Sequence, residues 1–292
     1  MRSIALLTRR NLRVFFRDRS GVFFSLLSAL ILIALYALFL GGIQIDSLKT
    51  WFPTASDADV RWFVNSWVFA GITMITTLTT SLAALGVFVD DNVSGRFRDF
   101  IVSPIRRSHL ILGYMIAGFT VSLVMTAIII AIGQLYLLTQ GDTPLSPANL
   151  AETGGSVILS SAAFSALSTF AVTFLRSAGA FTALSTVVGS LIGFFSGAYV
   201  PAGTLPSSVV GGINVLPFAQ AAMLIRKPYT EQALAALVDG QNDAARAVRA
   251  FYGMSGSVGD FAVTAGVAVG TLVVVTVLFL GLGAWRLSRT IR

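Results

Sequence analysis

The sequence contains no cysteine and a single histidine, His109. A disulfide, a thiolate site and a metal site built on clustered histidines are therefore excluded within this chain. Charge is also scarce, because 11% of the 292 residues are charged, against roughly a quarter in soluble globular proteins. So few charges cannot cover the surface of a water-soluble protein of this size. The composition, with 55% hydrophobic residues, predicts an all-α membrane protein.

Six stretches without Asp, Glu, Lys, Arg or His are long enough to cross a bilayer, which needs about 20 apolar helical residues. The fifth is long enough for two spans, but Pro201, Pro206 and Pro217 interrupt it. We therefore expect one span at 178–200, followed by a broken, re-entrant piece, and six spans in all. The six stretches are residues 20–45, 62–89, 110–141, 153–175, 177–225 and 261–285.

An even number of spans places both termini on the same side of the membrane. The segments on that side carry 14 of the 20 basic residues and 4 of the 13 acidic ones. Cytoplasmic segments of membrane proteins carry the excess of Lys and Arg, so we expect both termini in the cytoplasm. The basic excess of the chain is thereby explained, and no nucleic-acid partner is expected.

The first 20 residues combine six arginines with an apolar stripe formed by Leu12, Phe15 and Phe16. This pattern predicts an amphipathic helix that lies in the inner membrane interface. An ordinary basic lead-in to the first span is the alternative. Near the other end, residues 229–252 are Ala-rich and predict a surface cap of two short helices divided at Gly240.

No predicted span carries an ionisable residue between its ends, so a carboxylate proton relay is not expected. A phosphate-binding loop needs Gly-Lys before Ser or Thr, whereas Lys49 and Lys227 follow Leu48 and Arg226. We expect no catalytic residue, cofactor or metal in this chain, and His109 is expected to be an interfacial anchor. The chain therefore either receives work from another polypeptide or forms a passive pore.

The longest charged cytoplasmic segment is 90–109, and it is the candidate to receive that work. Helical spacing places Phe97, Phe100 and Ile101 on one face, and the Ser-Pro pair at 103–104 ends the helix. Such a face fits either a groove on a partner protein or the lipid surface.

This segment resembles the coupling region of the ABC type-2 exporter permeases, the membrane subunits of bacterial drug, lipid and polysaccharide exporters. The family pattern is an acidic start, a Gly, spaced apolar residues, Ser/Thr-Pro and a Gly in the third span, here Gly113. Arg96 and Arg98 stand where that family has a hydroxyl residue and an acid. The resemblance implies ATPase-coupling roles for Asp91, Gly95, Arg96, Phe97, Arg98, Asp99, Phe100, Ser103 and Pro104.

A second resemblance covers 196–226, where Ser-Gly and three prolines precede Arg226. In the family, this external segment forms a re-entrant hairpin before the last span. The whole chain, 1–292, is thus expected to be one transmembrane permease domain. Its parts are an interfacial helix (1–20), a cytoplasmic coupling loop (90–109) and an extracytoplasmic re-entrant and cap region (201–260).

The resemblance implies a membrane subunit of an exporter in the plasma membrane of a prokaryote, moving an amphiphilic or hydrophobic substrate outward. Two separate ATPase subunits would bind the ATP and Mg²⁺, and a second copy or a sister permease would complete the membrane part. A non-transporting sensor or partner subunit and a passive channel are the alternatives.

The family resemblance also places the substrate path along spans two and five. Helix packing is the alternative role for the threonines, and anchoring at the membrane interface is the alternative for the aromatic residues. The implied path residues are Thr73, Thr76, Thr77, Thr80, Phe194, Phe195 and Tyr199.

Overall fold

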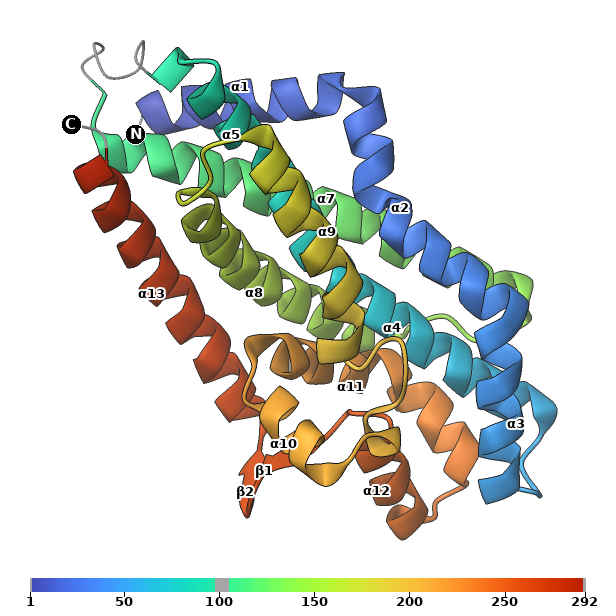
Figure 1. The fold of residues 1–292 in the computed structure, drawn as a ribbon. Helices are drawn as coiled ribbons and strands as arrows, with labels where there is room; N and C mark the ends of the chain where they lie inside the picture. The colour runs from blue at the N-terminus through green and yellow to red at the C-terminus, as the bar shows by residue number, and fades with distance from the viewer. Residues whose placement is uncertain (1, 98–104, 291–292) are drawn as a thin grey trace.

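The computed structural model describes residues 2–97 and 105–290, which form a helical bundle with one small β-hairpin (Figure 1). The elements of the first half are α1 (Arg2–Arg17), α2 (Arg19–Leu35), the π-helix η1 (Tyr36–Leu40), α3 (Gly41–Trp51), α4 (Asp57–Ala84), α5 (Gly86–Val93) and α7 (Arg107–Thr139). Those of the second half are α8 (Pro147–Val172), α9 (Ala178–Phe195), the 3-10 helix η2 (Ala202–Thr204), α10 (Ser207–Asn214), α11 (Pro217–Val238), α12 (Asn242–Phe251), β1 (Gly256–Val258), β2 (Phe261–Val263) and α13 (Ala265–Thr290).

Six helical segments of the described chain are long and apolar enough to cross a membrane, which confirms the predicted number. α2, η1 and α3 form the first, and α4 with α5 forms the second. The other four are α7, α8, α9 and the larger part of α13. Figure 1 shows the start of α1, α5 and the end of α13 at one end of the bundle, with α3, α10 and α12 at the opposite end.

α4 is the centre of the bundle, packed against α2, α7, α8 and α11. Ser56 caps it by accepting a hydrogen bond from the Asp59 amide, and two acidic residues occupy its first turn, where they favour the helix dipole. In the most apolar 18 residues of each span, the buried share is 78% for the second span, against 22% for the first, 11% for α9 and 17% for α13. The outer faces of those three spans are therefore left for lipid or another subunit.

The fifth span ends earlier than predicted. The expected limit was residue 200, but α9 ends at Phe195. Gly197 follows with φ +64°, a left-handed conformation that favours glycine, and the chain turns back there. The Tyr199 hydroxyl then donates to the Gly189 carbonyl at 3.1 Å, so the last predicted turn lies folded over α9.

α1 packs on the bundle, and its contact face differs from the predicted stripe. Leu7, Asn11 and Phe15 are buried and face α7, whereas Phe16 is 40% exposed. A Cβ on Gly113 of α7 would lie 2.7 Å from the Leu7 Cβ, so the small residue allows the close approach. The apolar face of α1 is thus used mainly inside the protein, and Phe16 is the one residue of the stripe that is exposed.

At the far end, α10 and α11 meet at an angle of 89°. The predicted re-entrant hairpin at this place stays a prediction. Gly240, with φ +80°, separates α11 from α12 and confirms the predicted division. The predicted surface cap contributes to the interior as well, because Leu234, Leu237 and Val248 belong to the main hydrophobic core. β1 and β2 pair antiparallel just before α13.

Candidate functional site

The predicted coupling region begins at a buried carboxylate. The Asp91 side chain is 0% exposed, and Arg10 of α1 binds it with both terminal nitrogens, Nη2 donating to Oδ1 at 2.8 Å. Tyr114 of α7 donates its hydroxyl to Oδ2 at 2.6 Å, and Arg96 Nη1 lies 3.2 Å from Oδ1. The hydrogen bond to Asp91 raises the pKa of Arg10 above its ordinary value. One carboxylate therefore joins α1, α5 and α7 at this end of the bundle.

Gly95 and Phe97 follow this cluster along the chain. Gly95 has φ +77°, which permits the reversal after α5. Phe97 is 6% exposed, with its ring centroid 5.1 Å from that of Phe88 and 6.1 Å from that of Tyr114. From the sequence, this ring was expected to lie either in a groove of a partner protein or in lipid. The structure instead buries it in an aromatic cluster of the same chain. Five further predicted coupling residues lie outside the described part of the chain: Arg98, Asp99, Phe100, Ser103 and Pro104.

The predicted threonines of the second span lie along α4 in the bundle interior. Each hydroxyl donates to a carbonyl of its own helix, three or four residues earlier, at 2.6 to 2.8 Å. Their side chains are at most 1% exposed. The hydroxyls are thus satisfied without a ligand, and a substrate-contacting role for them stays a prediction. These residues are Thr73, Thr76, Thr77 and Thr80.

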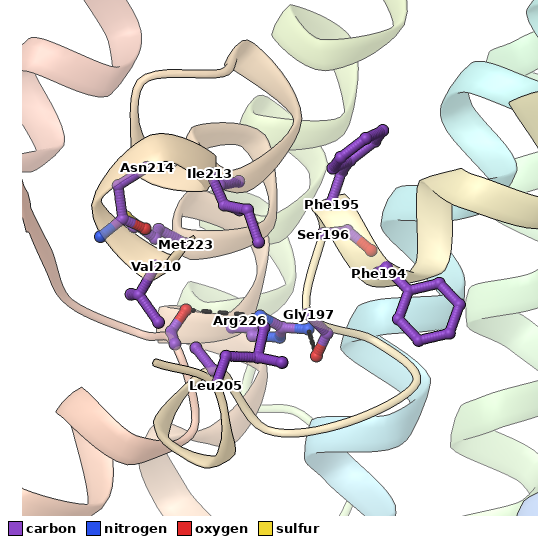
Figure 2. A pocket seen from close by; sticks show the side chains of 13 residues that line it. Phe194, Phe195, Ser196, Gly197, Leu205, Val210, Ile213, Asn214, Met223 and Arg226 are labelled. Atoms are coloured by element: carbon purple, nitrogen blue, oxygen red, sulfur yellow. Dashed lines mark hydrogen bonds between the residues drawn. The ribbon is translucent and has the colours of Figure 1, made fainter. Parts of the chain in front are cut away.

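The predicted aromatic residues of the fifth span gather where α9 ends. Phe194 is 48% exposed, and its ring stands edge-on to Tyr199 at 5.1 Å between centroids. Phe195 is half-buried and lines a cavity with Phe194, as Figure 2 shows. The structure thus brings these three residues together at the end of α9. Their role as path residues also stays a prediction.

Tyr199 can take this position because Gly193 has no side chain. A Cβ at Gly193 would lie 2.2 Å from the Tyr199 ring, whereas a Cβ at Gly189 meets nothing within 4 Å. Gly193→Ala is expected to lower the free energy of unfolding by about 1–3 kcal/mol, the usual effect of overpacking. Thermal unfolding in detergent measures this, with Gly189→Ala as the matched control. Equal melting temperatures of the two variants would show that the contact with Tyr199 is unimportant.

Sequence reasoning missed the internal use of Arg10, Tyr114 and Arg226. Arg226 is 1% exposed, and its Nη2 donates to the Gly197 carbonyl at 2.7 Å. A signal was available for it, since a single arginine follows the apolar run 221–225. Asp91 carried a similar signal, because Asp90 and Asp91 come straight after the apolar residues 86–89. A carboxylate or guanidinium inside an apolar segment needs a partner.

The described residues contain no group of three or more His, Cys, Asp or Glu side chains that could hold a metal ion. The charged groups of the Asp91 cluster join helices to one another. At this end of the bundle, the Asp91 carboxylate links α1, α5 and α7 to Arg96, which follows Gly95.

The ABC-2 type transporter family matches residues 2–228. Comparison with the curated proteins finds no match. The family match begins at α1 and extends into α11, so it includes the Asp91 cluster, the first five spans and Arg226. Because it covers well over half of the chain, the chain belongs to the ABC-2 type transporter family and is a multi-pass membrane permease subunit of an ABC transporter.

Proposed function

We propose that this permease is the membrane-spanning part of an exporter that moves an amphiphilic or hydrophobic substrate outward. The observation that carries the proposal is the family match in a chain that has no phosphate-binding loop. ATP and Mg²⁺ would then be bound by two partner ATPase subunits on the cytoplasmic side. A second copy or a sister permease would complete the membrane part.

The distribution of arginine supports the orientation in this proposal. The end of the bundle that holds α1, the Asp91 cluster and the end of α13 is the Arg-rich end, and Arg-rich segments face the cytoplasm. The proposal places the protein in the plasma membrane of a prokaryote, with both termini inside. The ATPases would dock at the segment 90–109, and α1 would be the second contact.

Substrate would pass along the second and fifth spans. Most of α9 is not covered by other parts of the same chain. This supports the proposed path, because a second permease packed against α9 would enclose a path between two subunits. Phe194, Phe195 and Tyr199 would line its outer part, and the α4 threonines would line its inner part after a rearrangement that exposes them.

Charge reversal in the coupling segment tests the ATPase contact. Arg98→Glu and Asp99→Lys are each expected to uncouple ATP hydrolysis from export, because complementary charge fixes the docking register of two proteins. Export and ATPase activity are measured in vesicles containing the complete transporter. Arg246→Glu, an exposed change in α12 at the other end, is the matched control. Normal export by both reversed variants would count against the proposed contact.

A further inference from the structure

A cavity of about 470 Å³ lies where α8, α11 and α13 meet, at the end of the bundle opposite the Asp91 cluster (Figure 1). Its volume is within the range of small-molecule sites. None of its lining residues belongs to α4 or α9, so the cavity is separate from the proposed substrate path. Four charged side chains line it, two of each sign: Glu152 of α8, Lys227 and Glu231 of α11, and Arg249 of α12.

The packing of α8 on α11 brings the first two of these charges together. Ser156 of α8 donates its hydroxyl to the Leu224 carbonyl of α11 at 3.2 Å, and the amide of the residue that caps α8 donates to the Gln232 side chain at 2.8 Å. The two helices therefore run antiparallel. Glu152, one turn before Ser156, lies level with Lys227.

Arg249 reaches the cavity from the last turn of α12. Its carbonyl accepts hydrogen bonds from the amides of Met254 at 2.8 Å and Ser255 at 3.2 Å, so the chain folds back after the helix. The Thr230 hydroxyl of α11 lies 2.9 Å from the Met254 sulfur. This contact fixes the turn against α11, next to the position of Glu231.

The four charges are available to a ligand. Among the described residues, none of these side chains forms an ion pair or a hydrogen bond with another residue. Lys227 and Glu231 are four residues apart on one face of α11, but in the order that is less favourable for an ion pair within a helix. All four side chains are at least partly exposed, so the cavity is open to water. A ligand that carries both signs of charge matches such a site.

The walls favour one kind of zwitterion. Carboxylates accept hydrogen bonds from a primary ammonium, and lysine and arginine donate to phosphate oxygens. A quaternary ammonium is instead recognised by aromatic side chains, and the described lining residues include no Phe, Tyr or Trp. A primary ammonium joined to a phosphate therefore fits this cavity better than a quaternary ammonium joined to the same phosphate.

An apolar strip leads from the cavity along α13. Ala265 lines the cavity, and Val269 and Val273 follow at spacings of four residues, so the three share one face of the helix. Val269 is 42% exposed and Val273 is 45% exposed. This strip offers an apolar surface to an acyl chain whose head group occupies the cavity.

We propose that this cavity binds a phosphoethanolamine group. The ammonium binds at the carboxylates Glu152 and Glu231, and the phosphate binds at the cations Lys227 and Arg249. The same group occurs in membrane phospholipid, whose acyl chain then lies along the α13 strip, and in water-soluble compounds. The experiment separates these two sources. The inference goes beyond the proposed function, because the site lies outside the proposed path and its occupation needs no ATPase.

Native mass spectrometry of the purified chain in an uncharged detergent tests the site by counting bound ligand. The chain is titrated with lysophosphatidylethanolamine, lysophosphatidylcholine and lysophosphatidylglycerol that share one acyl chain. The first carries a primary ammonium, the second a quaternary one and the third none. Half-occupancy is expected at a concentration about tenfold lower for the first, because exposed ion pairs are each weak but several act together. Equal occupancy by the three lipids would overturn the proposal.

Two substitutions assign the preference to the cavity. Arg249→Gln and Glu231→Gln are each expected to reduce it about threefold, the effect of one exposed ion pair. Arg246→Gln, one turn earlier in α12 and 79% exposed, is the matched control and keeps the preference. Glu231 is an exposed residue, so its variant is expected to fold, and the melting temperature of each variant is recorded. A preference that persists unchanged in both variants would also contradict the proposal.

Competition with glycerophosphoethanolamine, which has the head group without an acyl chain, identifies the source. Displacement of lysophosphatidylethanolamine at a similar concentration indicates a water-soluble ligand. Failure to displace it indicates a lipid that also needs the α13 strip. Either result supports the head-group site, provided that the preference for phosphoethanolamine is present. Because no ATPase takes part, failure of this titration leaves the proposed export function to be judged by its own experiments.

Discussion

Asp91→Asn is expected to release α1 from the bundle. The substitution keeps the shape of the side chain but removes the negative charge that Arg10 and Arg96 share, and it disturbs the acceptor of the Tyr114 hydroxyl. Loss of one member of a buried ion pair typically costs about 3–5 kcal/mol. Arg10 is 32% exposed and can reach water after the change, so we expect about 3 kcal/mol of lost stability.

The absence of cysteine makes this detachment measurable. Leu7→Cys introduces the only thiol of the chain, at a position that is 6% exposed and packed on Gly113. Labelling by a maleimide is expected to be slow in this background and fast when Asp91→Asn is added. Asp90→Asn changes a neighbouring, exposed carboxylate and is the control. Slow labelling and an unchanged melting temperature in Asp91→Asn would mean that the buried cluster does not hold α1.

Phe97→Ala is expected to uncouple ATP hydrolysis from transport. Phe97 directly precedes the predicted coupling residues Arg98 and Asp99. Its ring packs against Phe88 of α5 and Tyr114 of α7. Truncation removes the contact through which a push on the segment would reach the bundle. Coupling free energies between two sites are typically about 1–3 kcal/mol, which corresponds to a change of roughly 5–150-fold in an equilibrium constant. On that scale, we expect the amount of substrate transported per ATP hydrolysed to fall about tenfold or more.

Three variants separate coupling from general loss of structure. Phe97→Leu keeps an apolar side chain and is expected to restore part of the transport. Val93→Ala, at a residue that is 53% exposed, is the control with an unchanged ratio. The ratio of transport to ATP hydrolysis is measured for all three variants in vesicles containing the complete transporter, with the melting temperature of each variant recorded. A Phe97→Ala transporter that moves substrate at the normal ratio would show that force enters the bundle elsewhere.

The spans could be predicted from the sequence because the rule behind them is local. A bilayer excludes ionisable side chains over about 20 residues, so windows without charge located all six spans. The limits were less accurate where tertiary contacts decide them. α9 ends at Phe195 because Tyr199 folds back onto Gly193, and no local pattern reveals that contact.

The electrostatic interior could be predicted only in part. Arg10 and Asp91 are 81 positions apart, and the sequence does not indicate which of the six arginines before residue 20 meets the carboxylate. Helical spacing did place aromatic residues on one face near Phe97, but it could not show that Phe88 and Tyr114 would cover that ring. Arg226 lay in a segment expected to be external, so its burial by glycines from three separate parts of the chain could not be predicted from composition.

The central claim is that the permease has no power source of its own and is driven by partner ATPases. The most direct measurement is reconstitution of the tagged chain in vesicles, alone and with the ATPase that copurifies with it in mild detergent. A fluorescent amphiphile reports transport, and phosphate release reports ATP hydrolysis. We predict neither activity from the chain alone, and ATP-dependent outward movement from the complex. Hydrolysis of ATP by the chain alone, or its movement of the amphiphile down an ion gradient without the ATPase, would contradict the account.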